Sequence, residues 1–107
     1  QIQQVFLNLL HNSLQAFSAD TKDKRISVSI ISETEANQIL IFIEDNGSGI
    51  PKAIQEKIFI PFYTTKEQGS GIGLALSRQI IQRHGGTLDL KESNSRCTCF
   101  RISIPKN

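Results

Sequence analysis

Asp45 is the side chain whose setting most clearly suggests chemistry. It closes a predicted strand that begins with the apolar, β-branched run 39–43, and Asn46, Gly47 and Gly49 follow it. Side chains alternate along a strand, so Asp45 shares a face with the odd-numbered residues of that run. If this face is packed, the carboxylate lies at the rim of a core and needs a partner. The glycines permit close approach of a ligand, although the same pattern fits a carboxylate that only caps a turn.

Asn8 and Asn12 are four residues apart in a pattern that predicts an amphipathic helix over residues 2–17. This spacing places both amides on one helix face, beside the apolar stripe. Asparagine is a mediocre helix former because its amide competes for the backbone, so an aligned pair suggests a specific use. Carboxamide oxygens are suitable ligands for a hard cation such as Mg²⁺. The alternative is a solvated helix face that carries two inert amides.

A third candidate is the segment with Gly69, Gly71 and Gly73, which opens a second predicted helix and has Lys66 just upstream. Free N–H groups and the helix dipole make a helix N-terminus a binding site for phosphate, and a lysine adds a point charge. Two familiar phosphate loops do not match. No glycine is followed by lysine, as a Walker loop requires, and the dinucleotide fingerprint needs G-x-G-x-x-G directly after a strand.

These candidates are carried by a chain that alternates helical and strand patterns. The apolar residues that predict the first helix are Ile2, Val5, Phe6, Leu9, Leu10, Leu14 and Phe17. Ile26, Val28 and Ile30 alternate with serines, which predicts a half-buried strand. The remaining predicted elements are the partner of that strand in an antiparallel hairpin at 39–45, a short helix at 52–58, a long helix from the glycine segment to His84, and strands at 87–90 and 98–104.

Composition limits the partners of this chain. With 107 residues it forms one domain with a real core, and a net charge of +2 is too small to argue for nucleic acid. No apolar run reaches the about 20 residues of a membrane helix, and the first residues do not resemble a signal peptide. Cys97 and Cys99 lack further zinc ligands nearby and fit a reducing cytosol, without a metal or a disulfide. The helical pattern already present at Gln1 suggests a piece of a longer protein.

Four motifs occur in one order along the chain. They are Asn8-Leu9-Leu10-His11-Asn12, Asp45-x-Gly47-x-Gly49, Phe59-x-Pro61-Phe62 and Gly69-Ser70-Gly71-Ile72-Gly73-Leu74. Together they resemble the N, G1, F and G2 boxes of the catalytic ATP-binding domain of sensor histidine kinases, in the wider class shared with DNA gyrase, Hsp90 and MutL. Residues 61–66 resemble the short-lid kinases of the nitrogen-regulation and sporulation type. The resemblance covers residues 4–105.

The resemblance implies an α/β fold, a two-layer sandwich of the Bergerat type with a mixed sheet of about four to five strands backed by three helices. The whole chain, residues 1–107, is then the histidine kinase catalytic and ATP-binding domain, without the dimerisation domain that carries the phosphoacceptor. Such kinases usually have a further strand before the asparagine helix. Its absence from the sequence leaves an open sheet edge.

The resemblance also implies a role for each motif. Asp45 accepts the adenine amino group, Gly49 lets the ring lie beside it, and Asn12 binds Mg²⁺. Asn8, Asn12 and Lys66 are the implied catalytic residues, and Asn12 is the implied metal ligand. The residues implied to contact ATP are Asn8, Asn12, Asp45, Gly47, Gly49, Ile50, Phe59, Phe62, Thr65, Lys66, Gly69, Gly71, Ile72, Gly73, Leu74 and Thr98.

The implied activity is transfer of the γ-phosphate of ATP to a histidine on a separate dimerisation domain, with Mg²⁺ as cofactor and a response regulator downstream. His11 and His84 lack the surroundings of that acceptor. Hydrolytic relatives carry a glutamate four residues before the Mg²⁺ asparagine, where Asn8 stands, and an amide cannot act as a general base near neutral pH. An ATP hydrolase and a non-catalytic nucleotide-binding module remain the alternatives. We expect a cytoplasmic domain without nucleic-acid or direct membrane contact, whose parent protein can be membrane-anchored.

Overall fold

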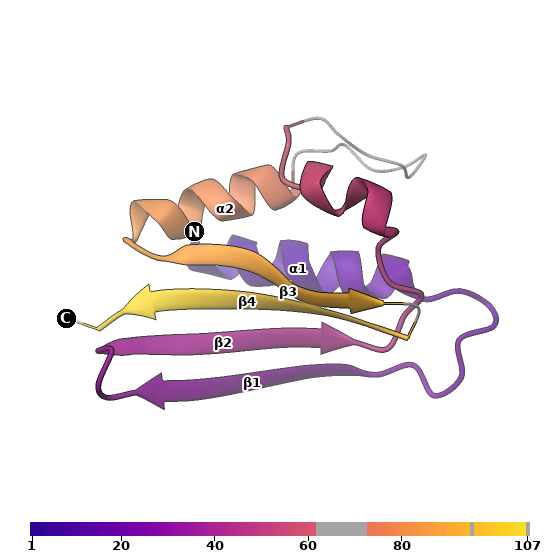
Figure 1. Cartoon of the computed structure of the whole chain (residues 1–107), viewed down its shortest axis with the longest axis horizontal. Coiled ribbons are helices and arrows are strands. Elements are labelled where there is room, and N and C mark those ends of the chain that lie inside the picture. The colour runs from indigo at the N-terminus through magenta and orange to yellow at the C-terminus, as the bar shows by residue number, and fades with distance from the viewer. Residues whose placement is uncertain (62–72, 95, 107) are drawn as a thin grey trace.

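The computed structural model describes residues 1–61, 73–94 and 96–106. Within these ranges the chain forms two layers, a four-stranded sheet and two long helices (Figure 1). The elements in chain order are α1 (Ile2–Ala16), β1 (Ile26–Glu33), β2 (Gln38–Asp45), η1 (Lys52–Lys57), α2 (Gly73–Arg83), β3 (Thr87–Asn94) and β4 (Cys97–Pro105). The predicted α/β sandwich is therefore confirmed, with the short helix η1 formed as a 3-10 helix.

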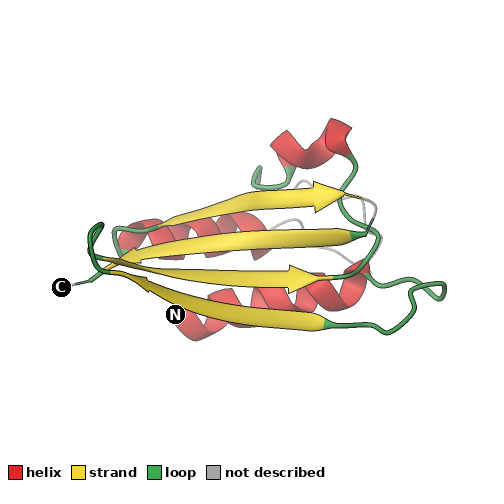
Figure 2. Cartoon of the chain, turned by 60° about the horizontal axis from the view of Figure 1, so that its bottom comes forward, coloured by secondary structure: helices red, strands yellow, loops and turns green. Residues whose placement is uncertain are grey.

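The two long helices bury the apolar stripes that predicted them. Val5 and Leu9 of α1 pack with Ile80 and Ile81 of α2 in one core against the sheet. Figure 2 shows both helices on the same side of the sheet. After α2 the chain turns at Gly85, whose φ of +79° is the left-handed conformation expected of a glycine helix stop. No helix in the described ranges is long and apolar enough to span a bilayer.

The sheet has the strand order β1-β2-β4-β3, and each neighbouring pair is antiparallel. The predicted hairpin of β1 and β2 is confirmed, but the prediction of a mixed sheet is wrong for the described strands. The reason is the placement of β4. The connection through η1 and α2 makes β3 run in the same direction as β2, yet β4 lies between them and is antiparallel to both, so no parallel pair forms.

The predicted burial of β1 is also wrong. Val28 and Ile30 lie opposite Ile43 and Ile41 of β2 and so share the helix-facing side of the sheet. They are nevertheless 51% and 69% exposed. β1 is the outermost strand, whereas α1 packs on β2 and α2 on β3. The alternation therefore predicted the correct face of the sheet for these side chains. The helices do not cover that face at the edge strand β1.

Candidate functional site

Asp45 and Thr98 form the buried end of the sheet where β2 and β4 pair. They lie opposite each other in the register, and each is 3% exposed. The Asp45 carboxylate shares its face with Ile41 and Ile43, both buried, as the alternation predicted. Its Oδ1 accepts a hydrogen bond from the backbone N–H of Gly47 at 2.9 Å. Asp45 is thus both a buried acid at a strand end and the cap of the turn that follows.

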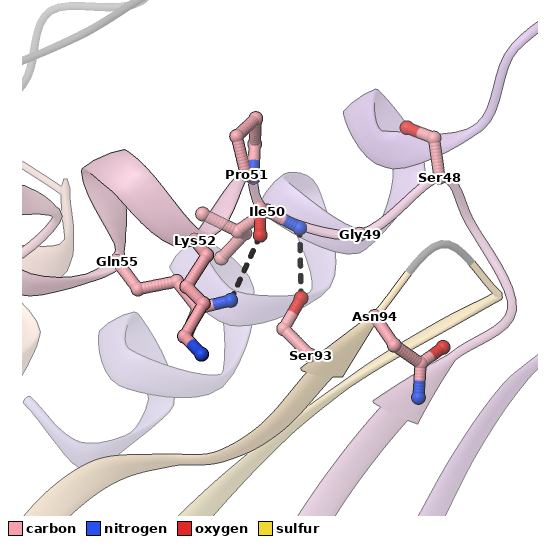
Figure 3. A pocket seen from close by; sticks show the side chains of 8 residues that line it. All are labelled: Ser48, Gly49, Ile50, Pro51, Lys52, Gln55, Ser93 and Asn94. Atoms are coloured by element: carbon pink, nitrogen blue, oxygen red, sulfur yellow. Dashed lines mark hydrogen bonds between the residues drawn. The ribbon is translucent and has the colours of Figure 1, made fainter.

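Ser93 connects this strand end to the loop after β2. Its hydroxyl lies 3.0 Å from Thr98 Oγ1 and accepts the backbone N–H of Ile50 at 2.7 Å. Gln55 Nε2 in turn donates to the Ile50 carbonyl at 2.9 Å, as Figure 3 shows. Ser93 was not among the predicted site residues, because the predicted strand ended at Leu90. Only the observed register, in which Ser93 pairs with Thr98, brings the two hydroxyls together.

The glycines of the loop after β2 allow close backbone contacts on both sides. A Cβ atom on Gly47 would lie 2.7 Å from the carbonyl oxygen of Ala16, at the end of α1. A Cβ atom on Gly49 would lie 1.8 Å from the carbonyl oxygen of Asn94, and the φ of Gly49 is +82°. The loop is therefore wedged between the end of α1 and the β3–β4 turn, and both positions require glycine for packing. The predicted approach of adenine to Gly49 stays a prediction.

A cavity of about 610 Å³ opens beside this loop, towards η1 and the end of β3 (Figure 3). It is lined by Ser48, Gly49, Ile50, Pro51, Lys52, Gln55, Ser93 and Asn94. Gly49 and Ile50 are the predicted ATP contacts among these residues. Asn8 and Asn12 do not line the cavity, so it is separate from the face of α1 that carries the asparagine pair.

Asn8 faces α2 rather than solvent. It is half-buried, and its Nδ2 donates to Ser77 Oγ at 3.2 Å and to the Gly73 carbonyl oxygen at 3.4 Å. The alternative of a solvated face with inert amides is therefore wrong for this residue. Asn12 is half-buried one turn further along α1, and its carboxamide makes no hydrogen bond within the described part of the chain. A neutral oxygen that no described residue occupies is what the metal hypothesis needs at this position.

Three further predicted contacts have defined surroundings. Gly73 is the first residue of α2, and Leu74 is half-buried and packs against the core. Phe59 meets Phe100 edge to face, with ring centres 6.4 Å apart, and the Arg78 guanidinium lies 4.1 Å from the centre of its ring. Phe59 thus anchors the segment after η1 to the core and to α2. Phe62, Thr65, Lys66, Gly69, Gly71 and Ile72 lie outside the described residues, and their roles stay predictions.

The two cysteines are not part of this site. Cys97 is half-buried and Cys99 is buried, and both thiols are free. Burial is the main cause that raises the pKa of each thiol. Nearby carboxylates raise the pKa further, chiefly Glu92 at Cys97 and Glu44 at Cys99. Among the described residues, no group of three or more His, Cys, Asp and Glu side chains is placed to hold a metal ion.

Comparison with known proteins assigns the family. The family model described as histidine kinase-, DNA gyrase B-, and HSP90-like ATPase matches residues 1–107. The signal transduction histidine-protein kinase AtoS of Escherichia coli is 42% identical over 99% of this chain, and sporulation kinase A of Bacillus subtilis is 34% identical over 99%. Each match covers 17% of the relative.

The solved catalytic domain of histidine kinase ThkA superimposes with a TM-score of 0.79 at 33% identity, covering 98% of this chain and 66% of that one. The chain spans less than a fifth of the length of the sensor kinases AtoS, DctB and TdiS. Three findings indicate the same family: the family model matches every residue, the relatives exceed 30% identity, and the fold is shared. The chain belongs to the histidine kinase-, DNA gyrase B- and HSP90-like ATPase family.

Proposed function

We propose that this chain is the ATP-binding catalytic domain of a two-component sensor histidine kinase. In this role it holds Mg²⁺–ATP while the γ-phosphate moves to a histidine on a separate dimerisation domain. The observation that carries the proposal is the buried Asp45 at the end of β2, the strand on which α1 with Asn8 and Asn12 packs. The similarity to sensor kinases over the whole chain supports the same role.

Base recognition follows from the chemistry of a buried carboxylate. A carboxylate offers only acceptor positions, and at Asp45 one oxygen is oriented by the Gly47 N–H at 2.9 Å. The exocyclic amino group of adenine donates to such an acceptor. Guanine presents a carbonyl oxygen at the equivalent position, which leaves two acceptors face to face in a desolvated pocket. Selection of ATP over GTP then comes from the cost of placing two acceptors against each other.

The asparagine pair fits a magnesium ion with phosphate ligands. Mg²⁺ is usually held by one or two protein oxygens, with phosphates and water completing the octahedron. Asn12, whose carboxamide makes no hydrogen bond to a described residue, would supply the protein oxygen, and Asn8 lies one turn away on the same face. When bound, Mg²⁺ neutralises phosphate charge during transfer. The backbone amides at the start of α2 and Lys66 are proposed to face the phosphates from the other side.

Asn8 favours phosphoryl transfer over hydrolysis. Its amide nitrogen donates to α2 at Ser77 and Gly73, which is a structural task that a carboxylate cannot perform. A side chain without a basic atom also cannot activate water. Phosphoryl transfer depends mainly on position and charge neutralisation. The missing general base is therefore no obstacle to a kinase, whereas a hydrolase needs one.

The proposal includes the partners of such a kinase. They are the histidine-containing dimerisation domain of the same protein and a downstream response regulator, and we place the domain in the cytoplasm. Equilibrium binding of a fluorescent ATP analogue tests the central step. Saturable binding that Mg²⁺ strengthens, and that ATP displaces better than GTP, is expected. Absence of saturable binding to the folded domain contradicts the proposal.

A further inference from the structure

A hydrogen-bonded joint connects the two long helices at Asn8. The Asn8 amide nitrogen lies 3.2 Å from Ser77 Oγ and 3.4 Å from the Gly73 carbonyl oxygen. The two acceptors are one turn apart on α2, and the amide has two N–H groups, one for each acceptor. Ser77 is completely buried. It lies among the apolar residues of α2, where a hydroxyl without a partner would cost stability.

The joint orients the carboxamide of Asn8. Both contacts use Nδ2, so neither occupies Oδ1, which projects from the opposite arm of the amide. Removal of the Ser77 hydroxyl would leave one N–H with no acceptor on α2, and the amide would be held by the Gly73 carbonyl alone. The Gly73 carbonyl can only accept and thus sets which atom of Asn8 faces α2, while Ser77 supplies the second contact that holds the amide in place.

The joint also lies between the two halves of the proposed phosphate site. Asn12, the proposed metal ligand, is one turn beyond Asn8 on α1. Gly73 is the first residue of α2, whose N-terminal amides are the proposed phosphate ligands. A bond that fixes α1 against the first turn of α2 therefore fixes the metal ligand relative to the phosphate ligands. A displacement of about 1 Å between such groups is enough to impair a phosphoryl-transfer site.

We propose that Ser77 is a positioning residue for the magnesium–nucleotide site, and that it acts through Asn8. The inference rests on the proposed function, because it concerns the metal and phosphates of ATP. A buried hydroxyl elsewhere in the fold, without a contact to Asn8, would not position the site in this way. Ser13 provides the comparison: it is 2% exposed in α1, and its hydroxyl has no hydrogen-bond partner among the described residues.

The test compares Ser77→Ala with the matched control Ser13→Ala. The dissociation constant of a fluorescent ATP analogue is measured with Mg²⁺ and with EDTA, after thermal unfolding has shown which variants are folded. For Ser77→Ala we expect binding with Mg²⁺ to weaken by about three- to tenfold, the range of one lost hydrogen bond. Binding in EDTA should change less than about twofold, since an effect through the metal disappears with the metal. Ser13→Ala should change neither constant by more than about twofold.

A double-mutant cycle with Asn8→Ala identifies the route of the effect. If Ser77 acts through Asn8, the variant with both substitutions binds Mg²⁺–nucleotide as Asn8→Ala does. Ser77→Cys keeps the size of the side chain and replaces Ser77→Ala if that variant is unstable. Equal weakening with and without Mg²⁺, or additive effects in the cycle, would overturn the inference and leave Ser77 a purely structural residue. If the wild-type domain does not bind the analogue at all, the proposed function fails. That outcome differs from equal weakening with and without Mg²⁺ and from additive effects in the cycle.

Discussion

Asp45 and Thr98 lie opposite each other across β2 and β4, and each is 3% exposed. Asp45 accepts the Gly47 N–H, and Thr98 contacts the Ser93 hydroxyl, which accepts the Ile50 N–H. Both ends of the loop after β2 are therefore tied to the same strand pair. An acid fixed in this way presents acceptor oxygens at a defined place, which is the requirement for recognition of a purine amino group.

Replacement of Asp45 by Asn should impair binding more than folding. The amide oxygen of Asn can still accept the Gly47 N–H, so the turn persists. The NH₂ group opposes the adenine amino group, and affinity for ATP should fall by at least about tenfold, the effect of losing a charge-assisted hydrogen bond. Isothermal titration calorimetry measures the affinity, and thermal unfolding checks the fold.

The control for this substitution is Asp89→Asn. Asp89 pairs with Arg78 at 3.3 Å, and its side chain is 40% exposed, outside the proposed site. Its replacement removes the same charge from the protein and should leave the affinity for ATP within about twofold of wild type, because exposed pairs contribute little. Equal losses of affinity in both variants would show that net charge, not the position of Asp45, governs binding.

Removal of the Ser93 hydroxyl should loosen the loop after β2. Ser93→Ala takes away the acceptor of the Ile50 N–H and the partner of Thr98, so the free energy of unfolding should fall by about 1–2 kcal/mol. Urea unfolding measures this change, and hydrogen exchange of the Ile50 amide should become faster. Ser27→Ala, at an exposed position of β1, should change the free energy of unfolding by less than about 0.5 kcal/mol. Unchanged exchange at Ile50 would contradict the assigned hydrogen bond.

Two glycines of the proposed site should respond in opposite ways to alanine. Gly49→Ala places a Cβ atom 1.8 Å from the Asn94 carbonyl at a φ of +82°, and should lower the free energy of unfolding by more than about 2 kcal/mol. At Gly73 the nearest described atom to an added Cβ is Asn8 Cγ at 3.8 Å, and the residue is helical. Gly73→Ala should therefore raise the stability by up to about 1 kcal/mol. Thermal unfolding compares the two variants, and similar losses in both would contradict the assigned packing.

The thiols should react slowly and in a fixed order. Burial raises the pKa of Cys97 and Cys99 above the ordinary value of 9.0, so little thiolate exists near neutral pH. Alkylation by iodoacetamide, followed by mass spectrometry, should accelerate as the pH rises past 9 and should modify half-buried Cys97 before buried Cys99. A raised pKa in the folded state also means that stability is lost as the pH rises through that value, because the unfolded thiols ionise first. Rapid alkylation at pH 7 would contradict the assigned surroundings.

Local patterns in the sequence were sufficient to predict most of the elements. The stripe with Val5 and Leu9 predicted α1, and the glycines after His84 predicted the end of α2. Strand alternation predicted that Asp45 is a buried acid, because it places the residue on the face of Ile41 and Ile43. These features depend on neighbours in sequence, and periodicity is visible without knowledge of the tertiary structure.

Features that depend on distant pairing could not be predicted. The insertion of β4 between β2 and β3 made the sheet wholly antiparallel, and no local pattern encodes the position of a strand in the sheet. The exposure of Val28 and Ile30 followed from the edge position of β1. Ser93 and Ser77 became relevant only through the partners that the fold supplies, Thr98 and Asn8.

The central claim is that the domain holds Mg²⁺–ATP for transfer and not for hydrolysis. The most direct measurement incubates the domain with γ-labelled ATP and Mg²⁺, with and without the dimerisation domain of the same kinase. We expect negligible phosphate release by the isolated domain, and acid-labile, base-stable label on a histidine of the added domain. Steady phosphate release without the acceptor, or an absence of label on the acceptor while ATP is bound, would contradict it.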